Sequence, residues 1–188
     1  MPNPMLERSP PRDLANRGQV IETKGKVSDF SRLVEIVEAD LGEMDRSDRP
    51  GDWRQSPVAI RLRFGWADSE PDIPSLVGHL STTVAAVCQR CLKPFELALE
   101  SDLKLLLPAA NVSPAGHEDY EVWEFDENNV SPADIVEEAL IMALPFSARH
   151  ESAENCRALD GNSQPGDSDT VAPFADLKSL MARAKDTK

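Results

Sequence analysis

Two cysteines separated by two residues are the side chains of this sequence best suited to chemistry. Cys88 and Cys91 form a Cys-x-x-Cys pair, and Cys156 follows much later, shortly after His150. Such a pair at a tight turn brings two sulfurs to one point, which is half of a tetrahedral zinc site. Cys88, Cys91, His150 and Cys156 are therefore a candidate set of metal ligands, with zinc as the candidate cofactor. The spacing from His150 to Cys156 is looser than in common zinc modules, so the sequence favours reduced structural thiols over a zinc site.

Thiol redox chemistry is a third interpretation of the cysteine pair. A thioredoxin-like pair leads into a helix, whose N-terminus helps to lower the thiol pKa. Here the pair leads into Leu92, Lys93 and Pro94 and then into a strand pattern. Arg90 could favour a thiolate locally, although a single arginine on a turn is also typical of a solvated surface. The sequence therefore ranks a thiol oxidoreductase below zinc binding and below structural thiols.

The remaining candidate catalytic side chains lack partners. His79 falls inside a strand pattern and His117 in an acidic loop, and neither has an evident nucleophile or acid beside it. The sequence contains no G-x-S-x-G, no phosphate-binding glycine loop and no H-E-x-x-H. It therefore lacks the motifs typical of α/β-hydrolases, P-loop NTPases and zinc metalloproteases. We therefore predict that the protein is not an enzyme.

Acidic side chains are the second candidate feature. The 20 basic and 33 acidic residues give a net charge of -13, and a field of that sign repels phosphate backbones. No Lys or Arg occurs between Lys104 and Arg149, and this stretch would attract a basic protein sooner than a nucleic acid; a merely solvated acidic surface is the alternative. The candidate partner-binding acids are Glu118, Asp119, Glu121, Glu124, Asp126 and Glu127.

Strands are expected on both sides of the cysteine pair. Apolar and polar residues alternate over 58–66, the period of a strand that buries one face, and similar patterns run over 76–87 and 95–107. The segment from Cys88 to Pro94 then becomes the turn of an antiparallel hairpin. Further strands are expected over 18–25 and 120–125.

Two helices are expected to pack on this sheet. Apolar residues recur at helical spacing from Phe30 to Leu41, with Ser28 or Asp29 as the cap. Ser131 and Pro132 are typical of a helix start, and an apolar stripe follows from Ile135 until Pro145 ends it. The fold class predicted is α+β, a mainly antiparallel sheet with two packed helices.

The ends of the chain are predicted to be less regular. Residues 1–17 are proline-rich and polar, which indicates an irregular, flexible lead-in. The domain is expected over 18–156, a flexible linker over 157–172, and a short anchor over 173–188 that places Phe174 and Leu177 on one helical side as further partner-binding candidates.

The cellular compartment predicted is the cytoplasm. The first residues contain no apolar run, and no window approaches the roughly 18 apolar residues that a membrane span needs, so no membrane association is expected. Three cysteines, an odd number, indicate reduced thiols more than a secreted disulfide framework.

Four motifs occur in one order, and they are Cys88–Phe95, the helix from Ile135 to Pro145, His150 to Cys156 and a closing segment from Ala172 to Leu180. This set of motifs resembles the YceD family, the large ribosomal RNA subunit accumulation proteins. It covers roughly residues 15–182 and implies a cytoplasmic, non-catalytic factor in synthesis or assembly of the large ribosomal subunit. Some relatives carry four cysteines, whereas the later half here offers only His150 and Cys156.

Three functions follow from these patterns. The first is a ribosome-biogenesis factor that supports large-subunit ribosomal RNA accumulation by contacting a basic ribosomal protein or an assembly intermediate through its acidic segment. The second is a zinc-dependent RNA-binding module, for which basic residues occur only in fragments such as Arg61 with Arg63. The third is a thiol oxidoreductase.

Overall fold

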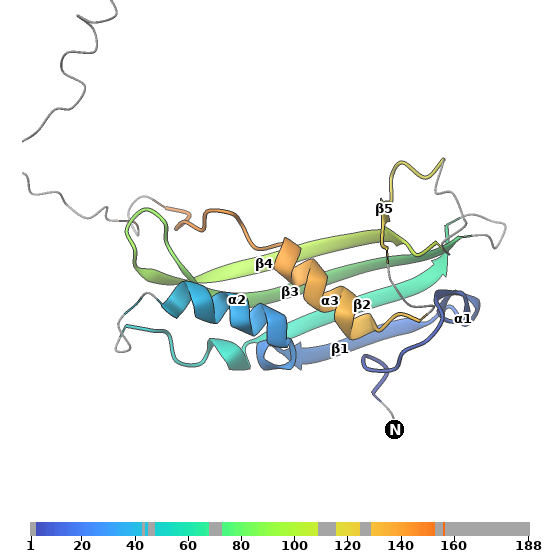
Figure 1. The fold of residues 1–188 in the computed structure, drawn as a ribbon, viewed down its shortest axis with the longest axis horizontal. Helices are drawn as coiled ribbons and strands as arrows, with labels where there is room; N and C mark the ends of the chain where they lie inside the picture. Colours follow the sequence, from blue (N-terminus) through green and yellow to red (C-terminus); the bar gives the residue numbers. More distant parts are fainter. Residues whose placement is uncertain are drawn as a thin grey trace, which may run out of the picture. The chain divides into compact units, whose positions relative to one another are not determined.

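The structure is a computed structural model that describes residues 3–42, 44, 48–67, 73–108, 116–124, 129–152 and 156 (Figure 1). The linker predicted over 157–172 and the anchor predicted over 173–188 lie outside the described residues.

A five-stranded sheet in the order β1-β2-β3-β4-β5 forms the centre of the fold (Figure 1). The first four strands are antiparallel neighbours, and β5 (Glu121–Val122) adds in parallel to the end of β4. The four longer strands are β1 (Val20–Lys26), β2 (Pro57–Trp66), β3 (Pro74–Val87) and β4 (Pro94–Leu106). The mainly antiparallel sheet predicted from the sequence is confirmed.

Alternation along β2 shows why these segments are strands. Val58, Ile60, Leu62 and Phe64 are at most 4% exposed, whereas the side chain of Arg61 between them is exposed. A strand with this pattern buries one face of the sheet and leaves the other in water. The same alternation holds in β3 and β4, so the buried face is continuous across the sheet.

Two helices cover the buried face, α2 (Ser31–Gly42) and α3 (Pro132–Met142) (Figure 1). Leu33, Val37 and Leu41 of α2 are buried, as are Ile135 and Leu140 of α3, and all five belong to one hydrophobic core with the strands. Short 3-10 helices, η1 (Val27–Asp29) and η2 (Trp53–Gln55), flank the connection between β1 and β2. The two predicted helices are therefore confirmed, with boundaries within a few residues of the expected ones.

The start of α2 differs from the prediction that Ser28 or Asp29 caps it. The carboxylate of Asp29 accepts a hydrogen bond of 2.8 Å from the backbone N–H of Lys26, inside η1. The N–H of Arg32, in the first turn of α2, donates instead to Glu137 of α3 at 2.7 Å. A side chain that is distant in sequence thus satisfies a helix N-terminus that local residues leave open.

The N-terminal segment is more structured than the irregular lead-in expected over 1–17. It contains a short helix, α1 (Pro11–Asn16), with proline at the first position, and Leu14 is 4% exposed. Met5 is also buried, and its C=O accepts the N–H of Ala133 at 2.9 Å. Six helical residues are too few to show a period in a proline-rich sequence, but burial against the sheet stabilises them.

No helix among the residues described is both long and apolar enough to cross a membrane.

Candidate functional site

The cysteine pair lies on the turn that joins β3 to β4. The backbone N–H of Cys88 donates to the C=O of Lys93 at 2.9 Å, and the N–H of Leu92 donates to the C=O of Cys88 at 2.8 Å. Leu92 closes this turn with a φ of 56°, in the left-handed region that non-glycine residues seldom occupy. A strained residue held in place by its surroundings is a feature of functional sites, and here it accompanies two buried sulfurs.

The chain that leaves α3 returns to this turn. The N–H of Gln89 donates to the C=O of Ala148 at 2.9 Å, which fixes the returning segment to the turn. The rings of Phe95 and His150 contact each other with their centroids 4.6 Å apart. Pro145 stops α3 just before this return, because proline cannot continue a helix without losing a hydrogen bond. His150 is thereby placed beside the cysteines.

The structure brings all four candidate ligands together. The Sγ atoms of Cys88 and Cys156 are 3.6 Å apart, and Nδ1 of His150 is 3.6 Å from Sγ of Cys91. One ligand atom from each of the four residues lies within 4.8 Å of the others. A zinc ion with tetrahedral bonds of about 2.3 Å to sulfur would hold its sulfurs about 3.8 Å apart. Three thiols and an imidazole at this spacing fit zinc, and they fit it with little movement.

Burial identifies the kind of metal site that these residues would make. Cys88, Cys91 and Cys156 are 0%, 2% and 3% exposed, and they form a small cluster of their own with Phe95 against it. Catalytic zinc sites keep one position open to water or substrate, whereas structural sites are closed by four protein ligands. The four residues offer a closed, structural site.

Ionisation of the cysteines follows the same geometry. Burial opposes the charge on Cys88, but hydrogen bonds from the backbone N–H groups of Arg90, Cys91 and His150 and from the Cys156 thiol outweigh it. They lower the pKa of Cys88 from 9.0 to about 5. Burial raises the pKa of Cys156 to about 11, and the neighbouring sulfurs of Cys88 and Cys91 add to that rise. The hydrogen bonds thus favour the charged form of Cys88, whereas burial and the neighbouring sulfurs disfavour a charge on Cys156.

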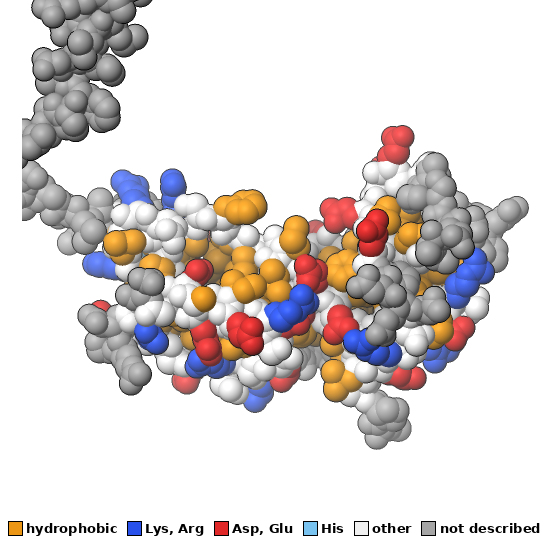
Figure 2. Space-filling model, in the orientation of Figure 1, with side chains coloured by type: hydrophobic (Ala, Val, Ile, Leu, Met, Phe, Trp, Pro, Cys, Tyr) orange, Lys and Arg blue, Asp and Glu red, His pale blue; other side chains and the backbone are white. Residues whose placement is uncertain are grey.

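The acidic candidate residues gather around β5, at the other end of β4. Glu118, Asp119, Glu121 and Glu124 are all exposed. Asp119 forms an ion pair of 3.5 Å with Lys104, although its own side chain is 87% exposed. In Figure 2, acidic side chains gather where Figure 1 shows β5. Asp126, Glu127, Phe174 and Leu177 lie outside the described residues.

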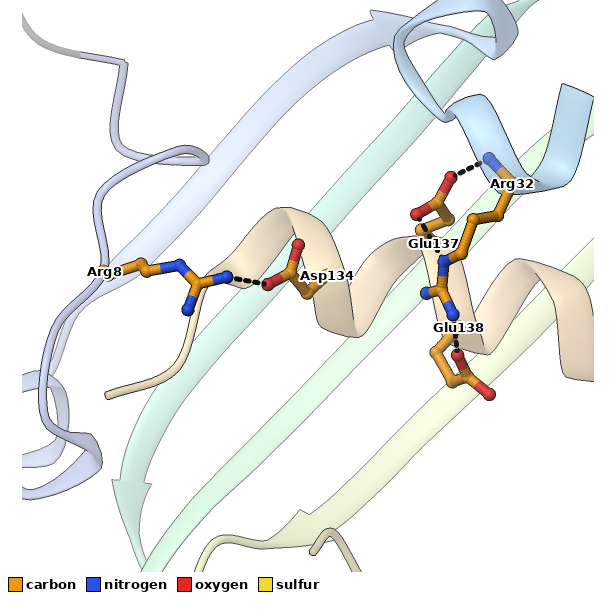
Figure 3. Close-up of polar contacts among 5 residues, drawn as sticks. All are labelled: Arg8, Arg32, Asp134, Glu137 and Glu138. Atoms are coloured by element: carbon orange, nitrogen blue, oxygen red, sulfur yellow. Dashed lines mark hydrogen bonds and ion pairs between the residues drawn. The ribbon is translucent and has the colours of Figure 1, made fainter. Parts of the chain in front are cut away.

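Three later acids of the same stretch contact basic side chains instead. Asp134 pairs with Arg8 at 3.3 Å, and Glu137 and Glu138 both pair with Arg32 (Figure 3). These contacts fasten α3 to the N-terminal segment and to α2. Around β5, Asp119 pairs with Lys104, whereas no described residue is paired with Glu118, Glu121 or Glu124.

A comparison with protein-family models decides the family. The model described as large ribosomal RNA subunit accumulation protein YceD matches residues 76–181, more than half of the 188-residue chain. The chain belongs to the YceD family. The matched segment begins within β3 and includes the cysteine turn, β4, the acidic stretch, α3 and Cys156. No curated protein and no solved structure matches the chain.

The surroundings of the cysteine turn add residues that sequence reasoning did not connect in this YceD-family protein. Arg90 and Lys93 lie exposed on the turn, and Arg149 lies exposed beside His150. The side chain of Phe146 is fully exposed, and Leu92 is 57% exposed. The signal available was the clustering of Arg90, Lys93 and Arg149 around the four ligands in sequence. Exposed cations and an exposed aromatic ring thus occur on the two segments that supply the candidate ligands.

Proposed function

We propose that this YceD-family protein is a non-catalytic factor in production of the large ribosomal subunit. It supports accumulation of the subunit's ribosomal RNA by binding a basic ribosomal protein, alone or within an assembly intermediate. The observation that carries the proposal is the exposed acidic group around β5, which consists of Glu118, Glu121 and Glu124. No described residue is paired with any of these three carboxylates.

Charge explains why the partner is a protein. The chain carries a net charge of -13, and concentrated negative charge attracts lysine- and arginine-rich surfaces while it repels phosphate. Exposed pairs are worth little singly, about 0–1 kcal/mol, but they raise the rate of encounter and select against acidic partners. An acidic patch on a small, otherwise stable sheet suits transient capture of a basic protein.

The candidate zinc centre has a separate role in this proposal. A closed site of Cys88, Cys91, His150 and Cys156 would join the β3–β4 turn to the segment after α3, because its ligands come from both. Bound zinc would supply structural stability there, not a reaction. The binding energy of a structural site is largely folding energy, so the ion would hold one end of the sheet firm.

A binding assay tests the acidic group. The protein would be immobilised and exposed to a purified mixture of large-subunit ribosomal proteins. We expect retention of basic proteins by the unaltered chain, and at least a tenfold loss of affinity when Glu118→Gln, Glu121→Gln and Glu124→Gln are combined. The matched control combines Glu7→Gln, Glu35→Gln and Asp40→Asn, which removes three exposed acids elsewhere. Equal loss in both triple variants would show that only total charge matters and would contradict the proposal.

The second candidate function is a zinc-dependent RNA-binding module. It is favoured by Arg90, Lys93 and Arg149 around the cysteine cluster, together with the exposed ring of Phe146. Cations contact phosphates and aromatic rings stack on unpaired bases, so this end of the molecule has both elements of a single-strand contact. In Figure 2, basic side chains lie at the end opposite the acidic group, and further basic side chains lie at the same end as that group.

A salt titration separates the two functions. If ribosomal RNA fragments bind the basic group, affinity falls steeply with salt, and each lost phosphate contact lowers the slope by about 0.7–0.9. Combining Arg90→Gln, Lys93→Gln and Arg149→Gln would then remove most of that slope. Unchanged binding in this triple variant would exclude RNA contact at the cysteine turn.

The thiol-oxidoreductase alternative is disfavoured by burial. A redox-active thiolate must reach its substrate, whereas the three sulfurs are at most 3% exposed and the pair leads into β4, not into a helix. Insulin reduction by the unaltered protein, abolished by Cys88→Ser, would restore that alternative.

A further inference from the structure

The outer edge of β4 has backbone groups with no described partner. In an antiparallel strand, the N–H and the C=O of one residue both point toward the same neighbouring strand. The two groups of the next residue point toward the opposite side. The N–H of Leu107 donates to the C=O of Pro74 at the start of β3, whereas the C=O of Leu106 accepts the N–H of Trp123 just after β5. Even-numbered residues of β4 therefore direct their backbone away from β3. Over Glu96–Asp102 no described residue pairs with them, because β5 reaches only Leu105 and Leu106.

The side chains at these outward positions are mainly acidic. Five residues of β4 have an outward backbone and an exposed side chain, and they are Glu96, Ala98, Glu100, Asp102 and Lys104. Alternate residues repeat about every 6.6 Å along one face of the edge, so the carboxylates of Glu96, Glu100 and Asp102 are spread over about 20 Å. Asp102 is already 2.7 Å from Nδ1 of His79 on β3, so Glu96 and Glu100 are the carboxylates that have no described partner.

The chain itself shows that this edge accepts a strand. β5 pairs in parallel with Leu105 and Leu106, through backbone atoms of the same outward set. The open positions continue directly from that pairing toward the start of β4. Glu118 and Asp119 precede β5, and Lys104 lies between Asp102 and the β5 pairing, where it forms an ion pair of 3.5 Å with Asp119.

The opposite edge of the sheet lacks these properties. β1 carries Lys24 and Lys26 at outward positions, and the N–H of Lys26 is already bonded to Asp29. Lysines on an edge strand are a common protection against pairing with other chains. The two edges therefore differ in charge, and the N–H of Lys26 is not available to a further strand.

We propose that the β4 edge from Glu96 to Asp102 binds an extended, lysine- or arginine-rich segment of a partner protein as an added strand. Backbone hydrogen bonds hold the segment, and its cations alternate opposite Glu96 and Glu100. This inference rests on the proposed function for the identity of the partner, a basic ribosomal protein. It adds where on the sheet, and in which conformation, that protein is bound.

Amide hydrogen exchange tests the added strand directly. The probe is a twelve-residue peptide of alternating lysine and valine, mixed with the full-length protein. We expect the amides of Glu96, Ala98, Glu100 and Asp102 to exchange freely in the protein alone, and at least tenfold more slowly with the peptide. Protection of these amides before the peptide is added would overturn the proposal, because the edge would already be occupied. Absence of added protection with the peptide bound would overturn it too.

A proline substitution supplies the second measurement. Ala98→Pro removes an outward N–H that the sheet does not use, and proline is tolerated at such positions on edge strands. We expect peptide affinity to fall about tenfold, the equivalent of one or two lost hydrogen bonds. Ala98→Val keeps the N–H and Lys24→Pro makes the same change on the other edge, so both should bind as the unaltered protein does. Equal binding by Ala98→Pro would refute the edge as the site. The exchange result stands even if Ala98→Pro lowers stability.

Retention of ribosomal proteins by the immobilised protein distinguishes this inference from the proposed function on which it rests. Loss of retention in Ala98→Pro as well as in the acidic triple variant supports both. Loss in the triple variant alone refutes the β4 edge and leaves the proposed function standing. If the unaltered protein retains no ribosomal protein, the proposed function fails, and the exchange experiment still decides whether the edge binds basic strands.

Discussion

The carboxylate of Glu137 on α3 accepts a hydrogen bond of 2.7 Å from the backbone N–H of Arg32, in the first turn of α2. The other oxygen of the same carboxylate accepts from Nε of Arg32 at 3.0 Å, and Glu138 accepts from Nη1 at 2.8 Å (Figure 3). Hydrogen bonds to Glu137 and then to Glu138 raise the pKa of Arg32 above its usual value. One acidic turn of α3 thus bonds both to the N-terminal backbone of α2 and to the side chain of Arg32, so the two helices are held in register over the sheet.

Replacing Glu137 and Glu138 one at a time compares the stability contributed by a helix cap with that contributed by a surface ion pair. Glu137 is 12% exposed and bonds to the backbone of α2, whereas Glu138 is 37% exposed and contacts only the guanidinium. We expect Glu137→Ala to lower the free energy of unfolding by about 1–2 kcal/mol, the usual effect of losing a helix N-cap. Glu138→Ala should cost less than about 1 kcal/mol. Urea denaturation measures both, and equal effects would show that the cap contributes nothing.

The strands and the ligand cluster could be predicted because their signals are local. Alternation with period two identifies β2 without knowledge of its neighbours. The Cys88–Cys91 spacing places two sulfurs on one turn whatever the rest of the chain does. His150 and Cys156 needed one further step, the helix stop at Pro145, which sends the chain back toward the hairpin.

The remaining features depend on contacts between distant segments. Nothing near Arg32 indicates that its N–H bonds to Glu137, because the two lie 105 residues apart. The burial of Met5 could not be expected from a proline-rich segment without apolar periodicity. The left-handed Leu92 was also hidden, since glycine, not leucine, is the usual signal of that conformation.

Met5 gives a sharp test of the N-terminal segment. Its side chain is 6% exposed in the main core, and its C=O accepts hydrogen bonds from Ser131 and Ala133. Met5→Ala should lower the free energy of unfolding by about 2 kcal/mol or more, because it leaves a cavity in the core. The neighbouring Leu6 is 69% exposed, so Leu6→Ala should change stability by less than about 0.5 kcal/mol. Similar denaturation curves for the two variants would contradict this packing.

Leu140 tests whether α3 belongs to the core. It is 0% exposed, and a carboxylate placed there without a partner would cost several kcal/mol, comparable with a whole stability of about 5–15 kcal/mol. We therefore expect Leu140→Asp to unfold the domain. Met142, two residues later, is 76% exposed, and Met142→Asp should leave the thermal melting nearly unchanged. Circular dichroism on heating distinguishes them, and a normal melt for Leu140→Asp would remove α3 from the core.

The conformation of Leu92 predicts a stabilising substitution. Its φ of 56° costs a non-glycine residue about 1 kcal/mol, and its side chain is 57% exposed, so little burial is lost on its removal. Leu92→Gly should raise the free energy of unfolding by up to about 1 kcal/mol, because relief of strain exceeds the added entropy of the unfolded chain. Leu92→Val should lower it, since β-branched residues tolerate this region least. Thermal melting that places valine above glycine would show that the turn is not strained.

Zinc content is the decisive measurement on the cysteine cluster. The four ligand atoms lie within 4.8 Å of one another and the three sulfurs are buried, which is the arrangement of a closed structural site. We expect about one zinc per chain in protein purified without chelator or added metal, by elemental analysis. Removing it should lower the free energy of unfolding by several kcal/mol, because the site joins the β3–β4 turn to the segment after α3 and its binding energy stabilises the fold. Cys88→Ser and His150→Ala should lose the metal and melt at a lower temperature. His79 lies on the open face of the sheet, so His79→Ala should keep both the zinc content and the melting temperature of the unaltered protein. Metal-free protein that melts as the unaltered chain does, together with a Cys88→Ser variant of parental stability, would leave the three cysteines as buried thiols that pack beneath Phe95.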